Sequence, residues 1–264
     1  MNNTDFREIV WQKGHELYRD MPWRQDMRPY YVLVSELMLQ QTQVERVIPK
    51  FNEFIAAFPD EVSLARASLS DVLKLWQGLG YNRRAKFLHE TAKRIVELGS
   101  FPNTKEGLVK LPGVGINTAG AILVYSFNQP VVFVETNIRT VYFHHYFETS
   151  DKVDDKLIIE KMLQTSDSEH PREWYWALMD YGSWLKKQGL GRVQQSKHYA
   201  KQAPLKGSVR EVRGQIVKAL VEADITRSKL SVQLKADARF ESALAGLLRD
   251  GLVTESATKL HLTK

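Results

Sequence analysis

Apolar and polar residues alternate along most of this chain with the period of an α-helix. In residues 6–18, for example, Phe6, Ile9, Val10 and Leu17 recur at helical spacing. Glycine and proline interrupt the pattern at intervals, so we expect separate helices at residues 6–18, 30–43, 44–58, 69–77, 85–98, 105–110, 117–127, 136–147, 156–165 and 173–188. Because no strands alternate with these helices and no repeat occurs, the pattern predicts an all-α body.

The pattern changes after residue 188. Residues 189–208 lack periodicity and contain three glycines and a proline, which predicts a linker. Three further helical patterns follow, at residues 210–223, 228–234 and 236–250. Short apolar runs at 252–254 and 259–262 then flank a turn, as in a β-hairpin. Three helices and a hairpin are typical of a winged helix, a module that binds DNA through its third helix or serves as a protein-contact domain.

The charge distribution favours a polyanionic partner. The 264 residues have a net charge of +6, and between Lys186 and Lys218 nine Lys or Arg residues stand against one acid, Glu211. Such a run repels itself unless phosphates or solvent screen it. It is therefore either a DNA-contacting segment or a solvated tail.

Two classes of protein are excluded by composition. Without cysteine the chain has no disulfide, no thiolate nucleophile and no Cys-ligated zinc or iron–sulfur cluster. No run of 18 apolar residues or apolar signal segment occurs, so we expect a cytoplasmic protein with no membrane contact.

The sharpest local motif is Leu-Pro-Gly-Val-Gly at residues 111–115. Its two glycines allow a tight turn between helices, and the second helix would begin with free N–H groups that suit a phosphate. The alternative is an ordinary turn between two helices. The residues expected to contact a DNA backbone here are Pro112, Gly113, Val114, Gly115, Asn117 and Thr118.

Two acids stand in apolar surroundings. Glu36 lies within the apolar helix at 30–43, where desolvation would raise the pKa of its carboxyl and keep it able to donate a proton. In the alternative, Ser35 and Glu36 face solvent. Glu135 ends a β-branched run at 131–134, where it caps the next helix, has a surface role or faces a cleft.

Together these segments resemble MutY-type adenine DNA glycosylases of the helix-hairpin-helix superfamily and, more distantly, endonuclease III. The resemblance covers about residues 20–185 and rests on Pro22-Trp23-Arg24, the Glu36 segment, Gly78-Leu79-Gly80-Tyr81 and the hairpin, in the family's order. It implies a two-lobed glycosylase body at residues 1–190 with a cleft between the lobes. One lobe comprises 27–130 and the other 1–26 plus 131–190, followed by a basic linker at 191–207 and a winged-helix-like domain at 208–264.

The resemblance also implies catalytic roles. Glu36 corresponds to the acid that protonates the adenine ring and helps to activate water. Glu135 stands where the family has an aspartate that stabilises positive charge on the sugar. The extra methylene adds about 1.5 Å of reach, which costs on the order of 10²-fold in rate unless the backbone compensates. Asn117 replaces the lysine nucleophile of bifunctional relatives, so we expect no strand-cutting activity; Lys110 is a weak substitute.

Further residues are assigned by the same resemblance. Trp23 and Arg24 would line the adenine pocket; the alternatives are core packing for Trp23 and a surface charge for Arg24. Extruding a base requires side chains that fill the gap and contact the opposite strand, and the matching positions are Gln41, Thr42, Leu79 and Tyr81. Basic residues expected on the DNA backbone are Arg83, Arg84, Lys86, Lys197 and Lys201.

The resulting expectation is a monofunctional glycosylase of base excision repair. It would act as a monomer on double-stranded DNA with a damaged or mispaired base, extruding adenine opposite 8-oxoguanine or guanine between Glu36 and Glu135. The alternatives are another target base (uracil, thymine or hypoxanthine) and a non-catalytic lesion-binding or regulatory protein built around the winged helix.

Expected cofactors are few. Relatives bind an iron–sulfur cluster through four cysteines after the last helix of the body, and this chain lacks them. We expect no metal cofactor, with room for a monovalent cation at the hairpin, as in relatives, and we interpret His144 and His145 as structural. The small C-terminal module stands where the family has a larger Nudix-like domain for 8-oxoguanine.

Overall fold

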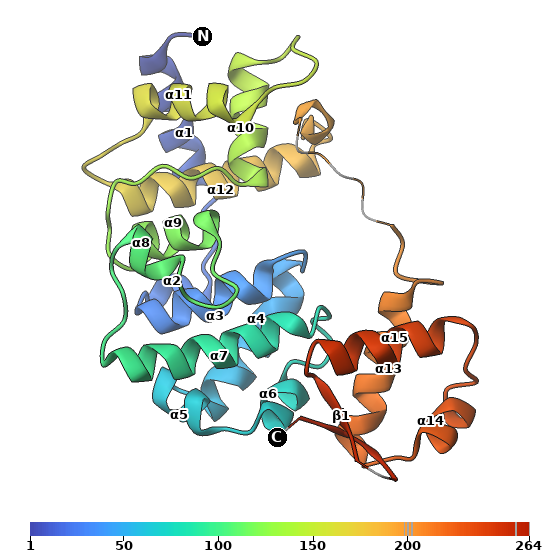
Figure 1. The fold of residues 1–264 in the computed structure, drawn as a ribbon. Helices are drawn as coiled ribbons and strands as arrows, with labels where there is room; N and C mark the ends of the chain where they lie inside the picture. Colours follow the sequence, from blue (N-terminus) through green and yellow to red (C-terminus); the bar gives the residue numbers. More distant parts are fainter. Residues whose placement is uncertain (198, 200, 202, 257, 264) are drawn as a thin grey trace. The chain divides into compact units, whose positions relative to one another are not determined.

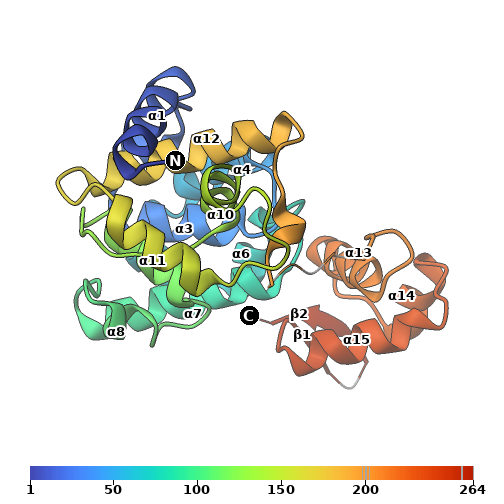
Figure 2. The same ribbon diagram turned by 90° about the horizontal axis from the view of Figure 1, so that it is seen from above.

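The computed structural model describes residues 1–264 except 198, 200, 202, 257 and 264. Helices dominate the described residues (Figures 1 and 2), and strands occur there only as one short hairpin near the C-terminus. The predicted all-α fold is therefore confirmed. The chain divides into two compact units. Unit 1 comprises Met1–Val32, Asn103–Lys110 and Val114–Lys201; unit 2 comprises Leu33–Pro102, Leu111–Gly113 and Gln202–Lys264.

Unit 1 is built around α12 (Pro171–Lys187), which packs against α1 (Asn3–Glu16) and α10 (Thr136–Tyr146). Phe6 is fully buried, and its ring centroid lies 5.0 Å from that of Tyr142. Burying these aromatic side chains contributes hydrophobic free energy to the packing of the helices. The remaining helical elements of unit 1 are α2 (Pro22–Gln25), α8 (Lys105–Leu108), α9 (Ile116–Tyr125), α11 (Asp155–Thr165) and the 3₁₀ turn η1 (Val193–Gln195).

Unit 2 contains α7 (Arg83–Leu98), whose apolar face packs against α5 (Glu61–Arg66) and α6 (Leu69–Leu75). Trp76, directly after α6, is fully buried, packs its ring 6.1 Å from that of Phe54 and donates from Nε1 to the carbonyl of Gly80. The helix α4 (Val44–Ala57) packs against α6 and completes this core. The helix α3 (Pro29–Leu39) begins in unit 1 and ends in unit 2.

The C-terminal module of unit 2 contains three helices and a hairpin. Its elements are α13 (Val209–Glu222), α14 (Arg227–Gln233), α15 (Arg239–Arg249), β1 (Val253–Glu255) and β2 (Leu260–Leu262). The strands are antiparallel, with Val253 opposite Leu262. Phe240, Leu244 and Leu247 are buried along one face of α15, so the module has a small core of its own. The order of elements matches the winged-helix pattern predicted from the sequence.

Several element boundaries differ from the predictions. Residues 236–238 were predicted as helix, but α15 begins at Arg239, because Lys235 has φ +48° and the Asp237 carboxylate accepts from the Arg239 backbone N–H. The helix predicted at 30–43 ends at Leu39. The short helices α2 and α5 and the turn η1 were missed, since three to six residues are too few for a periodic pattern.

The predicted boundaries of the lobes, the linker and the winged-helix-like domain stay a prediction. The two units are compact parts of the chain, and compactness alone does not show that a part folds independently. Among the described residues, none of the helices combines the length and apolar character that a membrane span requires.

Candidate functional site

The hairpin at residues 111–115 has the conformation that its glycines predict. Gly113 has φ +74°, and a Cβ there would lie 2.6 Å from the Cβ of Phe87, so only glycine fits. The Thr91 hydroxyl donates to the carbonyl of Pro112 at 2.7 Å and fixes the turn on α7. These contacts belong to unit 2.

In unit 1 the same motif continues as the start of α9. Gly115 is its N-cap residue, and no described side chain caps the helix. Ile116 is 62% exposed, and Gly115 and Asn117 are exposed too. A helix N-terminus left open in this way suits an anion. Val114 and Thr118 are buried, so their predicted contact with DNA would involve the backbone and not the side chains.

Asn117 holds the backbone that leads to Glu135. Its side-chain amide Nδ2 donates to the carbonyl oxygen of Val134 at 2.9 Å. Gly120 brings α9 close to the same segment: a Cβ at Gly120 would lie 2.7 Å from the Cβ of Phe133. Asn117 therefore has a structural contact next to the second candidate acid.

Tyr175 of α12 anchors the other side of this segment. Its ring stacks on that of Phe133 at 4.5 Å, and its hydroxyl accepts from the Phe133 N–H at 3.1 Å and donates to the Val131 carbonyl at 3.0 Å. Further along α12, Gly182 approaches the first turn of α10 so closely that a Cβ would lie 2.1 Å from the Asn137 carbonyl oxygen. Sequence analysis did not single out Tyr175, because a buried aromatic residue on a helix is typical of any core.

Glu135 is the N-cap residue of α10, but its side chain makes no capping hydrogen bond. The interpretation of Glu135 as a side-chain cap is therefore wrong. Burial raises its pKa, because the charged form is poorly solvated, while the positive charge of Arg139 acts in the opposite direction. Arg139 itself is bound by two hydrogen bonds to the carboxylate of Asp155.

Glu36 lies on α3 in unit 2 and is half-buried between fully buried neighbours. Ser35 is 0% exposed, so the alternative in which Ser35 and Glu36 both face solvent is wrong for Ser35. Glu36 and Glu135 belong to different units.

Arg24 forms a buried ion pair in unit 1 that the sequence did not reveal. Its guanidinium donates to both carboxylate oxygens of Asp180, at 2.6 and 3.0 Å, and Asp180 also accepts from the backbone N–H and Nε of Arg19. Arg24 and Asp180 are 5% and 2% exposed, so the alternative of a surface charge for Arg24 is wrong. Trp23 is 7% exposed, which leaves core packing open as its role.

The four residues predicted to probe the opposite strand lie on two loops of unit 2. Gln41 is exposed with φ +56°, and Tyr81 is half-exposed with φ +50°. These left-handed conformations are uncommon for residues with a Cβ and indicate a local constraint. Thr42 donates from its hydroxyl to the Leu79 carbonyl at 3.4 Å. Leu79 is 5% exposed, so its side chain is packed within the protein.

Arg84 is the constraint that joins the two loops. It is 7% exposed, and its guanidinium donates to carbonyl oxygens at the end of α3 and to those of the Leu79–Tyr81 loop. The acceptors are the carbonyls of Leu37, Met38, Gln40, Leu79 and Gly80 and the Thr42 hydroxyl, at 2.6–3.3 Å. Burial lowers its pKa to about 10. These bonds also explain why α3 ends at Leu39.

The other predicted DNA-backbone cations differ in their availability. The Arg83 side chain is 59% exposed, with its Nε 3.9 Å from a carboxylate oxygen of Asp250, and Lys86 donates to the Asp250 carbonyl at 2.7 Å. Lys197 lies 3.5 Å from the carboxylate of Asp154, and Lys201 is exposed. In the part of the chain that the structure describes, no group of three or more His, Cys, Asp or Glu side chains could hold a metal ion.

His144 and His145 lie at the end of α10, where His145 contacts the Tyr181 hydroxyl at 2.9 Å. Burial lowers the pKa of His145 to about 4. A neutral, packed imidazole fits the predicted structural role.

Comparison with known proteins identifies related sequences. Residues 34–165 match the family described as "HhH-GPD superfamily base excision DNA repair protein". An adenine DNA glycosylase of Mycobacterium tuberculosis is 32% identical over 279 residues, covering 96% of this chain and 91% of the relative. Another, from Buchnera aphidicola, is 38% identical over 187 residues, covering 69% of this chain and 53% of the relative. The chain spans about half the length of the first curated relatives that it matches.

Among solved structures, a thermostable thymine-DNA glycosylase superposes with a TM-score of 0.62 at 24% identity. The superposition covers 69% of this chain and 86% of that chain. At this identity the likeness concerns the fold, and it agrees with the helical body described above.

Proposed function

The chain belongs to the HhH-GPD superfamily of base excision DNA repair proteins, and we propose that it is a DNA glycosylase that removes adenine mispaired with 8-oxoguanine or guanine. The observation that carries the proposal is the match to an adenine DNA glycosylase along nearly its full length. Double-stranded DNA is the proposed partner of a monomer, and the nucleoid in the cytoplasm is the proposed location.

In the proposed reaction, Glu36 acts on the base. Adenine is a poor leaving group until its ring is protonated, so a carboxylic acid in a half-buried, apolar setting is a suitable donor. After the base departs, the resulting carboxylate accepts a proton from the attacking water. Hydrolysis of the N-glycosidic bond then leaves an abasic site.

Glu135 acts on the sugar in this proposal. As the glycosidic bond breaks, positive charge develops on the deoxyribose, and a carboxylate stabilises it. Two contacts hold the segment before Glu135, from Asn117 and Tyr175. They support a backbone position set to suit the longer side chain. Asn117 offers no amine, so the proposed enzyme forms no Schiff base and cuts no strand.

Recognition of the base is assigned to Trp23 and Arg24, with Arg24 oriented by Asp180. The DNA backbone would be bound at the hairpin and by exposed cations such as Arg83. The described residues supply no thiolates, so the proposal includes no iron–sulfur cluster; a monovalent cation at the hairpin remains part of it.

Single-turnover release of adenine tests the proposal. Duplexes with adenine opposite 8-oxoguanine, guanine or thymine are incubated with excess enzyme, and abasic sites are detected by alkaline cleavage. We expect release from the first two duplexes. Glu36→Gln should abolish release while retaining the affinity for DNA, because glutamine has a similar shape and no acidic proton.

Three results would contradict the proposal. Release of uracil, thymine or hypoxanthine in place of adenine would assign another target base. Tight binding to mispaired duplexes without release of any base would identify a lesion-binding protein. Alkali-independent strand cleavage would overturn the monofunctional assignment.

A further inference from the structure

Tyr81, one of the residues proposed to probe DNA, contacts two arginines of unit 2. The guanidinium of Arg84 lies 5.4 Å from the centroid of the Tyr81 ring, and that of Arg210 lies 5.2 Å from it. Arg210 also donates from Nη1 to the Tyr81 hydroxyl at 2.5 Å. The left-handed backbone of Tyr81 needs such support, because the conformation is unfavourable without it.

Arg210 comes from the first turn of α13, in the C-terminal module. A second bond, from Nη2 to the Ala203 carbonyl at 2.9 Å, fixes its guanidinium. The Tyr81 loop is therefore completed by a residue more than a hundred positions away in sequence.

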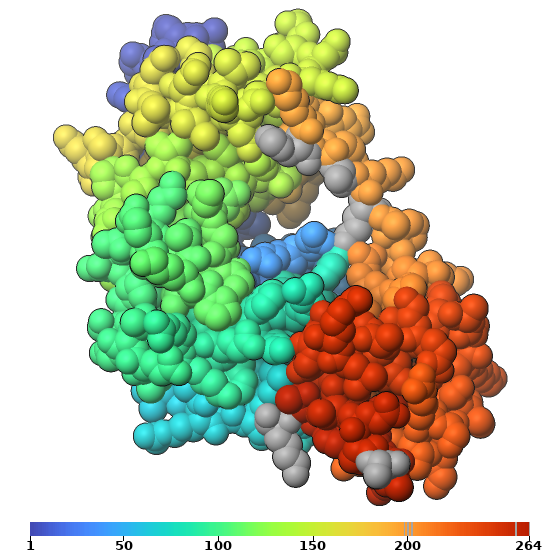
Figure 3. Space-filling view, in the orientation of Figure 1, coloured from blue at the N-terminus to red at the C-terminus, as the bar shows by residue number. Residues whose placement is uncertain are grey.

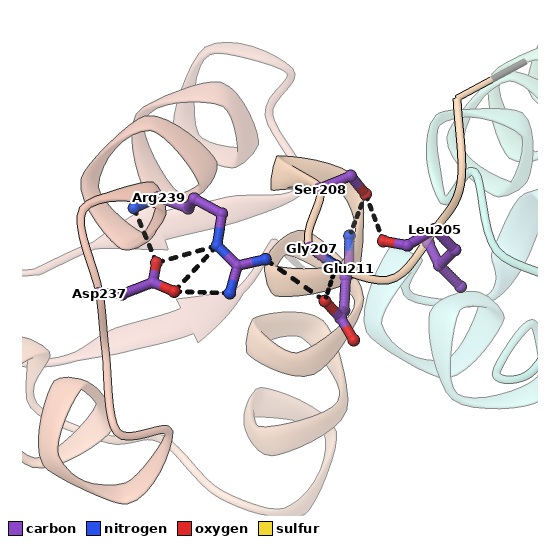
Figure 4. A network of polar contacts seen from close by, with 6 residues as sticks. All are labelled: Leu205, Gly207, Ser208, Glu211, Asp237 and Arg239. Atoms are coloured by element: carbon purple, nitrogen blue, oxygen red, sulfur yellow. Dashed lines mark hydrogen bonds and ion pairs between the residues drawn. The ribbon is translucent and has the colours of Figure 1, made fainter.

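A polar network fixes the start of α13 and hence Arg210 (Figure 4). Ser208 caps the helix by accepting from the Glu211 N–H, and the Glu211 carboxylate accepts from the Gly207 N–H at 2.8 Å. Arg239 then bridges the carboxylates of Glu211 and Asp237. Ordered neighbours reduce the freedom that Arg210 would otherwise lose on binding Tyr81.

The module is attached to α7 at a second place. Asp250, after α15, accepts from Lys86 through its carbonyl at 2.7 Å and from Arg213 through its carboxylate at 2.6 Å. Figure 3 shows the red C-terminal residues packed against the teal residues at the N-terminal end of α7. The contacts of Arg210 with Tyr81 and of Lys86 with Asp250 thus join the module to the rest of unit 2 at two places.

The third helix of the module is partly unsuited to reading DNA. Arg239, at its start, is engaged by Asp237 and Glu211, and Glu241 is exposed beside it. Ion pairs of this kind compete with phosphates for the guanidinium. The contacts of the module favour a docking role on the Tyr81 loop over groove reading by α15.

We propose that the C-terminal module acts in mispair recognition by positioning the Tyr81 loop, and that Arg210 is the positioning residue. The inference rests on the proposed function, since it assigns Tyr81 to the DNA. Arg210 acts through Tyr81 and not through a phosphate, so its contribution depends on the tyrosine hydroxyl and ring.

A double-mutant cycle tests the proposal. The variants are Arg210→Ala, Tyr81→Phe and the double substitution; Arg227→Ala is the control, because Arg227 pairs with Glu241 and Glu255 on the exposed side of the same module. Two quantities are measured for each: the ratio of Kd for matched over mispaired duplex at several salt concentrations, and the single-turnover rate of adenine release. Circular dichroism confirms folding.

We expect Arg210→Ala and Tyr81→Phe each to lower the preference for mispaired DNA by about tenfold. The double variant should lose less than the sum of the two single losses, because both substitutions remove the hydrogen bond between Arg210 and the Tyr81 hydroxyl. The salt dependence of Kd should stay that of the parent protein, and Arg227→Ala should change neither quantity.

Additive losses, together with a salt slope reduced by about one, would show that Arg210 binds a phosphate directly and would overturn the proposal. An unchanged preference in Arg210→Ala would also overturn it. A parent protein that prefers mispaired DNA but releases no adenine would contradict the proposed function alone, since the binding ratios still test Arg210.

Discussion

Replacing Gly182 with alanine tests how closely α12 must approach the turn after Glu135. A Cβ at residue 182 would lie 2.1 Å from the carbonyl oxygen of Asn137 and 2.7 Å from its carbonyl carbon. Unstrained carbon–oxygen contacts begin at about 3.3 Å, so the turn or the helix must move by about 1 Å. Asn137 lies two residues after Glu135, in the first turn of α10, and the displacement would reach the Glu135 backbone.

Two effects are expected from Gly182→Ala. Overpacking should lower the free energy of unfolding by about 1–3 kcal/mol. Displacing the carboxylate of Glu135, which is proposed to act on the sugar, by about 1 Å should lower the rate of adenine release on the order of 10²-fold. The rate is measured under single-turnover conditions with saturating enzyme, well below the unfolding temperature, so that loss of folded protein does not contribute.

Gly14→Ala is the matched control. A Cβ at Gly14 would lie 2.4 Å from the Cβ of Ala177, so the substitution overpacks the same helix, α12, against α1 instead of α10. It should destabilise the protein comparably and leave the rate constant unchanged. A parental rate constant in Gly182→Ala would refute the reasoning, and so would an equal loss of rate in Gly14→Ala.

Other predictions concern stability. Arg84→Met removes the donor of six acceptors and should lower the free energy of unfolding by on the order of 3 kcal/mol in urea titrations; Arg84→Lys should fail to restore it, because an ammonium lacks the planar fork. Asp180→Asn leaves Arg24 buried without its counter-charge and should cost about 3–5 kcal/mol by the same assay. Because the pKa of His145 lies near 4 in the folded protein against 6.5 ordinarily, the unfolded chain binds more protons between these values, and stability should decrease as pH falls from 6.5 to 4. His145→Gln should reduce that slope in thermal melts, and an unchanged slope would exclude His145 as its source.

The helices were predicted well from the sequence because the spacing of apolar residues in an amphipathic helix shows which face is buried. The helix at 85–98, for example, is found as α7 at Arg83–Leu98. The ends were harder to predict. The end of α3 depends on Arg84, some 45 residues away, and the start of α15 depends on a side-chain bond from Asp237.

The candidate site was predictable where a sequence motif specifies the residue. It was not predictable where the role of a residue depends on a contact with a residue distant in the sequence. The hairpin needs glycine at Gly113, and the sequence shows it. Asp180 and Tyr175 look like ordinary helix residues until their partners Arg24 and Phe133 are known. Glu135 could not be separated from a helix cap, because capping and catalytic acids occupy the same kind of position.

The buried guanidinium of Arg84 joins the ends of two loops, and this has a mechanical consequence. Its donors lie in one rigid plane, so the carbonyls of Leu37 and Leu79 cannot separate without breaking charged hydrogen bonds. A displacement of Gln41 on binding a duplex would then also displace Tyr81, and the two loops would open and close together. Hydrogen exchange of the amides at 40–42 and 79–81 should accordingly show one common opening rate, slowed to the same extent when DNA is bound.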